Sequence, residues 1–193
     1  MKDLIRELRI SLIATLSLAI ILCAIYPLII WVFAQGLFPA RANGSLLVRD
    51  GKVVGSRFIS QGFTDPKYFH PRPSAAGGGY DGAHSGATNL GPLSKKLIDA
   101  VRDRVVAYRT ENNLPSGTPV PADAVTASAS GLDPHISVKN AQLQARRVAK
   151  ARDMSVEVVL RKIEDHTEGR TLGILGEPRV NVLMLNLDLE GRP

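Results

Sequence analysis

Residues 10–38 read ISLIATLSLAIILCAIYPLIIWVFAQGLF, and no charged side chain occurs between Arg9 and Arg41. A helix of about 20 apolar residues is long enough to cross the roughly 30 Å hydrocarbon core of a bilayer. Because lipid offers no water to the backbone, such a segment must pair its own N–H and C=O groups within a helix. The stretch therefore predicts one transmembrane helix over residues 10–36, which Pro27 either kinks or marks as leaving the lipid.

A cleaved signal peptide is the main alternative to this anchor. The start of the chain is basic, and Ala40-Arg41-Ala42 has the small-x-small pattern of a cleavage site. The apolar core of a signal peptide is usually ~7 to 15 residues long, and this run is about twice that length. An uncleaved anchor is therefore favoured.

The orientation of the anchor depends on the lysine and arginine residues near its two ends. Bases occur within residues 1–9, and Arg41, Arg49 and Lys52 follow the apolar run. The balance leans toward a cytoplasmic N-terminal tail, residues 1–9. We therefore expect a single-pass membrane protein with residues 40–193 outside the cytoplasm.

Composition limits the chemistry of the rest of the chain. The single cysteine, Cys23, lies inside the apolar run, so residues 40–193 have no disulfide, thiol nucleophile or thiolate metal site. A formal charge of +6 would suit nucleic acid or anionic lipid. Acidic residues are interspersed with the basic ones, as at Arg102-Asp103-Arg104, which is typical of solvated helix faces. No nucleic-acid partner is expected.

Residues 40–193 read as one soluble domain of mixed α+β class. Asp50-Gly51 between two β-like runs indicates a hairpin over residues 45–58, because a type I′ turn needs positive φ at both central positions. Three helices are predicted from periodicity and cap residues: from about Ser94 to just before Asn112, from the cap Ser137 to about Ala151, and from the cap Ser155 to His166.

Residues 179–190 alternate in hydrophobicity. Leucines occupy every odd position from 183 to 189, with Asn186 and Asp188 between them. A period of two places the leucines on one face of an extended chain. The segment is therefore predicted as the clearest strand of the domain.

The stretch between Thr64 and Pro92 is rich in glycine and proline and has no sustained period. Loops of this length inside a compact domain are usually functional or disordered. Aromatic residues, histidines and an arginine are interspersed here, among them Tyr68, Phe69 and Arg72. We therefore expect an ordered surface that docks onto a partner.

Motifs for catalysis are weak. Gly86 and Gly91 have the glycine spacing of a phosphate-binding loop, but Pro92 stands where the lysine is needed. The histidines lack the short spacing of a zinc site, so no metal is expected. No cofactor of the chain's own is expected either, and no cofactor-binding residue can be named.

A serine hydrolase stays open as an alternative function. Acyl transfer needs a nucleophile, a base and an orienting acid. Ser128 or Ser130, Asp133, and His135 or His166 could supply them, although no G-x-S-x-G elbow is present. The competing interpretation, which is favoured, is that these residues shape turns and a helix start.

Six peptides in order together resemble one known family. They are Ala42-Asn-Gly-Ser-Leu46, Tyr68-Phe-His-Pro-Arg-Pro-Ser-Ala-Ala76, Ser85-Gly-Ala-Thr-Asn-Leu-Gly-Pro92, Val125-Thr-Ala-Ser-Ala-Ser-Gly-Leu-Asp133, Arg147-Val-Ala-Lys-Ala-Arg152 and Leu175-Gly-Glu-Pro-Arg-Val-Asn-Val182. The chain resembles the C subunit of the Kdp-type potassium-transporting ATPase over nearly its whole length.

This resemblance implies an accessory subunit of a complex for high-affinity potassium uptake in the cell inner membrane. Its partners would be a channel-like subunit that selects the ion, a P-type ATPase subunit, and the lipid bilayer. The family's C subunit is described as stabilising assembly and as a catalytic chaperone that raises the ATP affinity of the pump. A domain outside the cytoplasm cannot reach ATP there, so such an effect must pass through the span or the partner subunits. A tethered sensing or scaffold domain is a further alternative.

The family offers no catalytic residue to carry over, and no enzymatic activity is expected of the chain itself. Three of the six peptides, residues 68–76, 85–92 and 125–133, are predicted to be partner-facing or to define the shape of the surface. The candidate residues within them are Tyr68, Phe69, Arg72, Pro73, Ser74, Ser85, Asn89, Gly91, Ser128, Ser130, Gly131 and Asp133.

Overall fold

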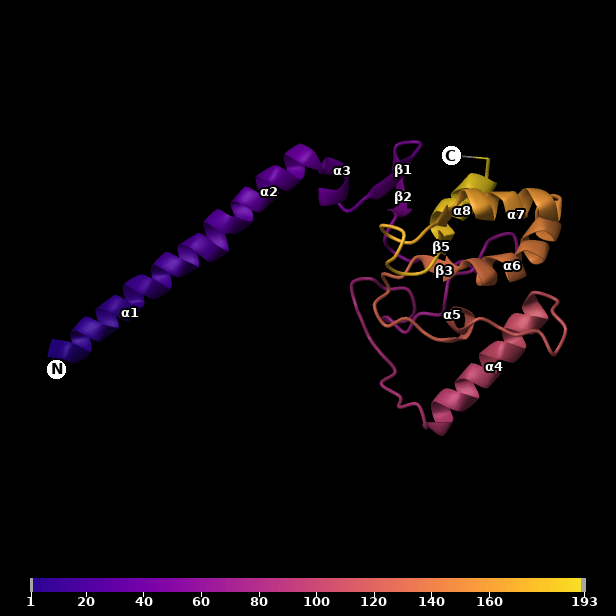
Figure 1. Cartoon of the computed structure of the whole chain (residues 1–193), viewed down its shortest axis with the longest axis horizontal. Helices are drawn as coiled ribbons and strands as arrows, with labels where there is room; N and C mark the ends of the chain where they lie inside the picture. Colours follow the sequence, from indigo (N-terminus) through magenta and orange to yellow (C-terminus); the bar gives the residue numbers. More distant parts are fainter. Residues whose placement is uncertain (1, 192–193) are drawn as a thin grey trace. The chain divides into compact units, whose positions relative to one another are not determined.

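The computed structural model describes residues 2–191, and the chain divides into two compact units between Val54 and Gly55. The first unit holds the long N-terminal helix, a short helix and most of a hairpin (Figure 1). The second holds the remaining helices and a three-stranded sheet. The fold class is thus a long apolar helix followed by an α+β domain, as predicted.

The N-terminal helix is continuous from Lys2 to Leu37, long and apolar enough to cross a membrane. It consists of α1 (Lys2–Ile20), the π-helical turn η1 (Ile21–Ile25) and α2 (Tyr26–Leu37). The N–H of Tyr26 donates to the carbonyl of Ile21, five residues back. Pro27 has no N–H, and its ring would crowd the carbonyl four residues back in a regular α-helix. The helix therefore widens before Pro27 and continues past it.

A hairpin follows the short helix α3 (Pro39–Ala42), with strands β1 (Leu46–Arg49) and β2 (Lys52–Ser56). Asp50 has φ +46° and Gly51 has φ +74°. Positive φ at both central positions is the type I′ geometry that matches the twist of the strands. The predicted hairpin is confirmed.

The second unit is built around an antiparallel sheet of β3 (His135–Ser137), β5 (Arg179–Asn181) and β4 (Thr167–Glu168), with β5 in the middle. Ile136 and Thr167 both pair with Val180. The helices α6 (Val138–Ala151), α7 (Val156–Asp165) and α8 (Val182–Leu189) lie around the sheet (Figure 1). Their apolar side chains form the main core with Phe69, the only aromatic residue among its fully buried members.

Both predicted serine caps are present. The Ser137 hydroxyl accepts the Asn140 N–H at 3.1 Å, and the Ser155 hydroxyl accepts the Val158 N–H at 3.3 Å. Each satisfies an amide that the first helical turn leaves unpaired. On α6 the small side chains of Ala141, Ala145, Val148 and Ala149 are buried, which lets α7 approach closely.

A second, smaller hydrophobic cluster is formed mainly by side chains of α4 (Lys95–Glu111) and α5 (Ala122–Val125). The bounds of α4 agree with the prediction that a helix ends before Asn112. Tyr108 is the largest buried member of the cluster, and its hydroxyl donates to the Asn140 side chain at 2.8 Å. This bond ties the second cluster to α6.

The prediction of a strand over residues 179–190 was wrong beyond its first three residues. Only Arg179–Asn181 is extended, and Val182–Leu189 forms α8. The Asn181 side chain accepts the Met184 N–H at 3.1 Å and so starts a helix. This helix is buried on most sides, so its leucines do not need to share one face. Asn186, which the alternation placed opposite the leucines, is 1% exposed.

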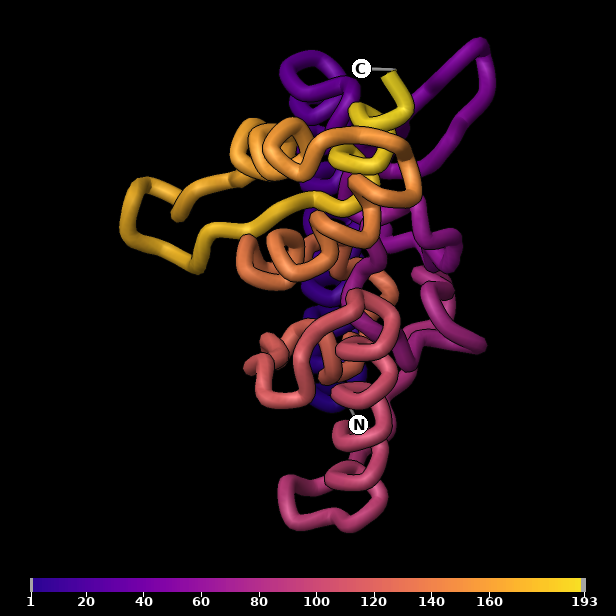
Figure 2. Tube along the Cα trace, turned by 90° about the vertical axis from the view of Figure 1, so that its right-hand side faces the viewer, coloured from indigo at the N-terminus to yellow at the C-terminus, as the bar shows by residue number. Residues whose placement is uncertain are grey.

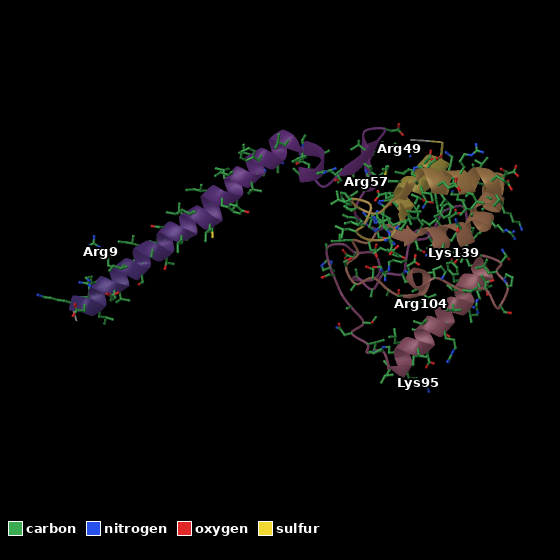
Figure 3. The ribbon with its side chains drawn as sticks, in the orientation of Figure 1. Arg9, Arg49, Arg57, Lys95, Arg104 and Lys139 are labelled. Atoms are coloured by element: carbon green, nitrogen blue, oxygen red, sulfur yellow. The ribbon has the colours of Figure 1, made fainter. Side chains whose placement is uncertain are left out.

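Basic residues are dispersed over the second unit. In Figure 3 the labelled residues of this unit lie apart from one another: Arg57 follows β2, Lys139 is on α6, and Lys95 and Arg104 are at different places along α4. Arg57 pairs with Glu168 at 2.8 Å, and Arg102 pairs with Asp99 at 3.3 Å. The positive net charge therefore forms no continuous stripe among these residues.

Candidate functional site

Backbone hydrogen bonds join all three predicted peptides, residues 68–76, 85–92 and 125–133. The Ala75 N–H donates to the Ser128 carbonyl at 2.7 Å, and the Ser128 N–H donates to the Pro73 carbonyl at 2.8 Å, which makes a one-residue parallel bridge between Ser74 and Ser128. The Gly86 N–H donates to the Ala129 carbonyl at 2.9 Å. We call residues 72–76, 86 and 126–133 together the loop cluster.

An ion pair between Arg72 and Asp133 joins the first and third peptides of the loop cluster. Arg72 Nη1 lies 2.8 Å from Asp133 Oδ2, and its Nη2 donates to the Thr126 carbonyl at 3.2 Å. Both charged side chains are about one quarter to one third exposed, at 26% and 31%. The hydroxyl of Tyr80 donates to the Arg72 carbonyl, and burial raises the pKa of that hydroxyl. The guanidinium thus holds a turn 61 residues further along the chain.

Gly131 lies where two backbones meet. It is buried with φ +68°, and a Cβ placed on it would fall 2.9 Å from the carbonyl carbon and oxygen of Asp81. Its own carbonyl accepts the Ser60 N–H at 3.3 Å. Only glycine meets both the left-handed conformation and the close approach.

Tyr68 and Phe69 lie at the other end of the first peptide and are fixed differently. The Phe69 ring is fully buried in the main core. The Tyr68 hydroxyl donates to Glu190, and this bond is the main reason that the pKa of Tyr68 is raised. The guanidinium of Arg152 lies over the Tyr68 ring, 5.2 Å from its centroid. Phe69 is therefore held inside the domain, whereas the half-buried Tyr68 is fixed in place by Glu190 and Arg152.

Two buried carboxamides hold the backbone of the first peptide. Asn186 on α8 accepts the Phe69 N–H at 2.8 Å and donates to the Phe69 carbonyl at 2.9 Å. Gln144 on α6 does the same for His70, at 2.8 and 3.0 Å. Each carboxamide accepts the N–H and donates to the C=O of the same residue, as the backbone of a neighbouring β-strand would do. The loop is therefore ordered without belonging to a sheet.

Arg147 on α6 completes this support. Its Nη1 donates to the Pro66 and Tyr68 carbonyls, at 2.6 and 2.9 Å, and its Nε donates to Asn112 at 3.0 Å. The residue is only 7% exposed, and burial lowers the pKa of its guanidinium. Glu111 lies 3.6 Å from Nε and supplies the nearby negative charge. Sequence reasoning missed Asn186, Gln144 and this role of Arg147.

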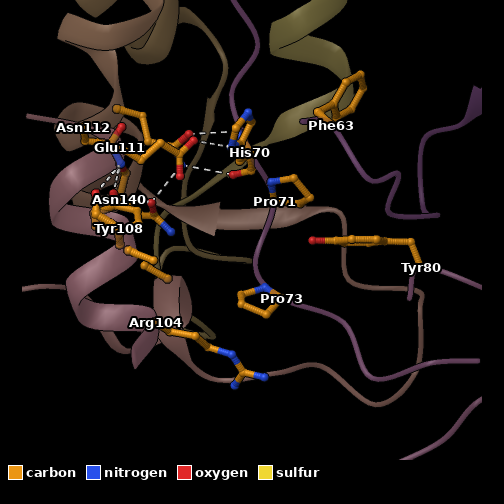
Figure 4. Close-up of a pocket in the computed structure, with 13 residues that line it drawn as sticks. Phe63, His70, Pro71, Pro73, Tyr80, Arg104, Tyr108, Glu111, Asn112 and Asn140 are labelled. Atoms are coloured by element: carbon orange, nitrogen blue, oxygen red, sulfur yellow. Dashed lines mark hydrogen bonds and ion pairs between the residues drawn. The ribbon is translucent and has the colours of Figure 1, made fainter. Parts of the chain in front are cut away.

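A cavity of about 210 Å³ lies between this peptide, α4 and α6 (Figure 4). His70 Nδ1 lies 2.6 Å from Glu111, and this contact is the main reason that the pKa of Glu111 is lowered. Figure 4 shows Phe63 and Tyr80 on the side opposite Glu111. The Asn140 carboxamide bonds to Tyr108, Gln144 and Asp123. Most polar groups of the wall thus already have protein partners, which gives a ligand little to recognise.

The remaining predicted residues are exposed. Ser85, Asn89 and Gly91 lie on the segment that leads to α4, and Asn89 has φ +50°. Leu93 follows them and is 92% exposed. Apart from Gly86, this segment lies outside the loop cluster, and whether it faces a partner stays a prediction.

The serine-hydrolase alternative finds no geometric support. Ser128 Oγ lies 3.3 Å from Ser130 Oγ, which accepts the Leu132 N–H. His135 faces Glu168 at 3.5 Å, and Asp133 is paired with Arg72. Within residues 2–191 no hydrogen bond joins either serine to a histidine. Over the same residues no group of three or more potential metal ligands is found.

Comparison with known proteins identifies the family. The family model KdpC, described as "K+-transporting ATPase, c chain", matches residues 8–191. The chain belongs to the KdpC family. A potassium-transporting ATPase KdpC subunit from Mycobacterium bovis is 57% identical over 185 residues, which cover 96% of this chain and 98% of the relative.

Other KdpC subunits are similar over comparable lengths. The one from Nitratidesulfovibrio vulgaris is 52% identical, covering 98% of this chain and 95% of its own. The one from Koribacter versatilis is 51% identical, covering 94% and 92%. The resemblance read from the six peptides is thus confirmed, and the KdpC chain described here is a subunit of a K+-transporting ATPase.

Proposed function

We propose that this KdpC chain is a non-catalytic, single-pass subunit that docks on the other subunits of the potassium-transporting ATPase and stabilises their assembly. The observation that carries the proposal is the match to the c chain of that ATPase over residues 8–191, in a chain that contains one long apolar helix. The second unit would lie outside the cytoplasm, with the helix in the cell inner membrane. Its partners would be the channel-like subunit, the P-type ATPase subunit and the surrounding lipid.

The internal contacts of the second unit support a docking role. Arg147, Asn186 and Gln144 use their hydrogen bonds to order residues 66–70. Arg72 likewise directs its bonds to the loop cluster. Irregular loops fixed in this way present a constant shape at low entropic cost on binding. A rigid surface without a catalytic constellation suits recognition of neighbouring subunits.

An effect on the ATP affinity of the pump would be indirect. A domain outside the cytoplasm cannot touch the nucleotide, so KdpC would act through a coupling free energy between its docking site and the nucleotide site. The coupling would pass through the span or through the partner subunits. In this proposal ATP belongs to the P-type ATPase subunit, and KdpC holds no cofactor of its own.

Assembly is tested by purifying the complex through a tag on this chain in mild detergent. The channel-like and ATPase subunits are expected to co-purify, and deletion of the chain is expected to abolish growth at micromolar potassium. Recovery of the chain alone, together with normal growth of the deletion strain, would overturn the proposal.

Topology is tested by cysteine labelling of intact cells in a Cys23→Ser background. Gly78→Cys is the suitable position, because Gly78 is exposed, a Cβ added to it would have nothing within 4 Å, and it lacks the positive φ of Gly77 and Gly79. A membrane-impermeant maleimide should label it without permeabilisation. The matched control is Glu7→Cys, exposed near the N-terminus, which should react only after permeabilisation. The reverse pattern would place the second unit in the cytoplasm.

A further inference from the structure

The β1–β2 hairpin carries an exposed apolar face. Exposed and half-buried positions alternate along β1, and the exposed ones are Leu46 (53%) and Val48 (64%). Val53 on β2 is 59% exposed, and the two-residue turn places it opposite Val48 on the same face. Figure 2 shows the two strands, in purple, running side by side to the turn that joins them. We call Leu46, Val48 and Val53 the hairpin face. A strand that meets water on one side normally places polar residues there, so this face is unusual for a solvated surface.

Hydrogen bonds tie the start of the hairpin to the end of the apolar helix. The carboxamides of Gln35 and Asn43 bond each other twice, with Asn43 Nδ2 donating to Gln35 Oε1 at 3.1 Å and Gln35 Nε2 donating to Asn43 Oδ1 at 3.3 Å. Asn43 Nδ2 also donates to the Pro39 carbonyl at 2.8 Å, and the Ser45 N–H donates to the Ala40 carbonyl at 2.8 Å. The chain therefore turns back through α3, and β1 begins close to the last turns of α2.

This attachment sets the depth at which the hairpin would lie in a bilayer. Residues 9 to 35 cover about 39 Å along a helix that rises about 1.5 Å per residue. The hydrocarbon core is about 30 Å thick, and the whole bilayer with its headgroups about 40–45 Å. If Arg9, the last charged residue before the apolar run, lies among the headgroups of one leaflet, Gln35 reaches the headgroups of the other. The strand that begins beside Gln35 therefore starts at the level of the headgroups.

The charges of this segment match phospholipid. Within residues 41–54 three side chains are basic, Arg41, Arg49 and Lys52, and only Asp50 is acidic. Arg49 and Lys52 lie on either side of the turn. Amphipathic helices on a membrane surface bury their apolar side chains about 5–10 Å into the boundary between headgroups and acyl chains, and their basic side chains stay near the phosphates. The hairpin carries the same two kinds of side chain.

We infer that the hairpin face lies on the phospholipid of the extracytoplasmic leaflet and forms a second membrane contact beside the span. The inference rests on the proposed function, because it requires the helix Lys2–Leu37 to cross the bilayer and the hairpin to lie outside the cytoplasm. The three apolar side chains would enter the boundary between headgroups and acyl chains, with Arg49 and Lys52 near phosphate groups. Together with the Gln35–Asn43 pair, this contact would restrict the movement of the chain where it leaves the bilayer.

Phospholipid suits the hairpin face better than a second protein surface does. Stable protein interfaces bury about 800 Å² per partner, and three side chains on a two-stranded hairpin offer far less. A contact with lipid needs no such area, because the span already holds the hairpin beside the headgroups at a high effective concentration.

Depth-dependent quenching tests the contact with the full chain in lipid nanodiscs. Val48→Cys in a Cys23→Ser background is labelled with the environment-sensitive dye NBD, and the phospholipid carries a nitroxide at the headgroup end of its acyl chain. The emission should shift to shorter wavelengths and should be quenched. The matched control is Gly117→Cys, at an exposed position with open space around it, which should show neither effect. A dye at position 48 that behaves like the control would overturn the inference.

Removal of the apolar face is a second test. With the dye moved to Leu46→Cys, the pair Val48→Ser and Val53→Ser should shift the hairpin from lipid to water about 10-fold or more, because the two apolar side chains supply most of the favourable transfer free energy. The melting temperature should stay unchanged, since both valines are exposed. Val106→Ser, at an exposed apolar position of α4, is the control and should leave the quenching unaltered. Equal quenching in the double variant and the control would contradict a contact through this face.

A photo-crosslinking amino acid at position 48 identifies the occupant in the assembled complex. Crosslinks to phospholipid are expected. Crosslinks to another subunit or to a second copy of the chain, or an absence of lipid crosslinks, would overturn the inference. If the unaltered chain is released from membranes by alkaline extraction, or recovers no other subunit, the proposed function fails instead, so the two failures are distinguishable.

Discussion

Asn186 bonds both polar backbone atoms of Phe69, accepting its N–H at 2.8 Å and donating to its carbonyl at 2.9 Å. The two residues are 117 positions apart, and both are buried. One carboxamide on α8 therefore attaches the loop that carries Phe69 to the main core. This contact links the C-terminal helix to the first of the peptides predicted to face a partner.

Asn186→Ala is expected to destabilise the domain by about 2–4 kcal/mol. The substitution leaves a buried N–H and a buried carbonyl unpaired, and each unpaired group costs about 1–3 kcal/mol. The measurement is the free energy of unfolding of the full chain in mild detergent, by urea titration followed by circular dichroism. A loss below about 0.5 kcal/mol, the usual effect of a neutral surface change, would show that the loop does not depend on this bond.

Gln144 and Gln142 provide a matched pair on α6. Gln144 is buried and bonds the backbone of His70 as well as Arg147, whereas Gln142 is exposed. Gln144→Ala should cost about 2–4 kcal/mol and should also weaken assembly, because His70 and the peptide around it lose their fixed position. Gln142→Ala should leave both properties within about 0.5 kcal/mol of the unaltered chain. Equal effects of the two changes would contradict this account of the loop.

The elements that were predicted correctly depend on local signals. Asp50-Gly51 alone specifies a type I′ turn, and Ser137 alone caps α6, because each acts on backbone groups within a few residues. The apolar run to Leu37 is equally local, since its length and composition are sufficient. Such features can be read without knowing the tertiary structure.

The failure at residues 182–189 has a physical cause. Periodicity distinguishes a strand from a helix only when one face is solvated, and α8 is buried on most sides. Val182, Leu185, Asn186 and Leu189 have helical spacing, which the odd-numbered leucines concealed. The asparagine cap at Asn181 was the local signal that favours a helix.

The sequence was sufficient to single out the peptides of the candidate site, but it did not predict which of their residues contact one another. Arg72 and Asp133 were both singled out, and their pairing across 61 positions was not. Asn186 and Gln144 were missed because their partners are loop backbone atoms distant in sequence. A polar residue within an apolar helical stripe, as at both positions, is the signal that could have found them.

Gly131→Ala tests the close approach inside the loop cluster. The added methyl would meet the Asp81 carbonyl at 2.9 Å, and the residue must also keep φ +68°. We expect a loss of at least about 1–2 kcal/mol in stability, together with weaker assembly, because the contact is with backbone that cannot rotate away. Gly117→Ala is the control, since that position has open space and no positive φ. A variant at position 131 as stable as the control would show that the two backbones can separate freely.

His135 should make stability depend on pH between neutrality and mild acid. Burial, and then the nearby charge of Arg179, lowers the pKa of its imidazole below the ordinary 6.5. The negative charges of Glu168, at 3.5 Å, and of Asp133 raise the pKa of His135, but by less than burial and Arg179 lower it. Between the lowered pKa and 6.5 the unfolded chain binds a proton that the folded chain does not, so stability falls as the pH falls below 6.5.

The change that isolates this effect is His135→Asn. Melting temperatures of the full chain in mild detergent would be compared at about pH 7.5 and about pH 5.5, on either side of the ordinary imidazole pKa. The unaltered chain should lose more stability on acidification than the variant, because asparagine takes up no proton. The lowered pKa of Glu168 keeps that carboxylate ionised in this range, so it does not contribute to the difference. Identical pH slopes in the two proteins would show that the His135 imidazole is as easily protonated in the folded chain as in the unfolded one.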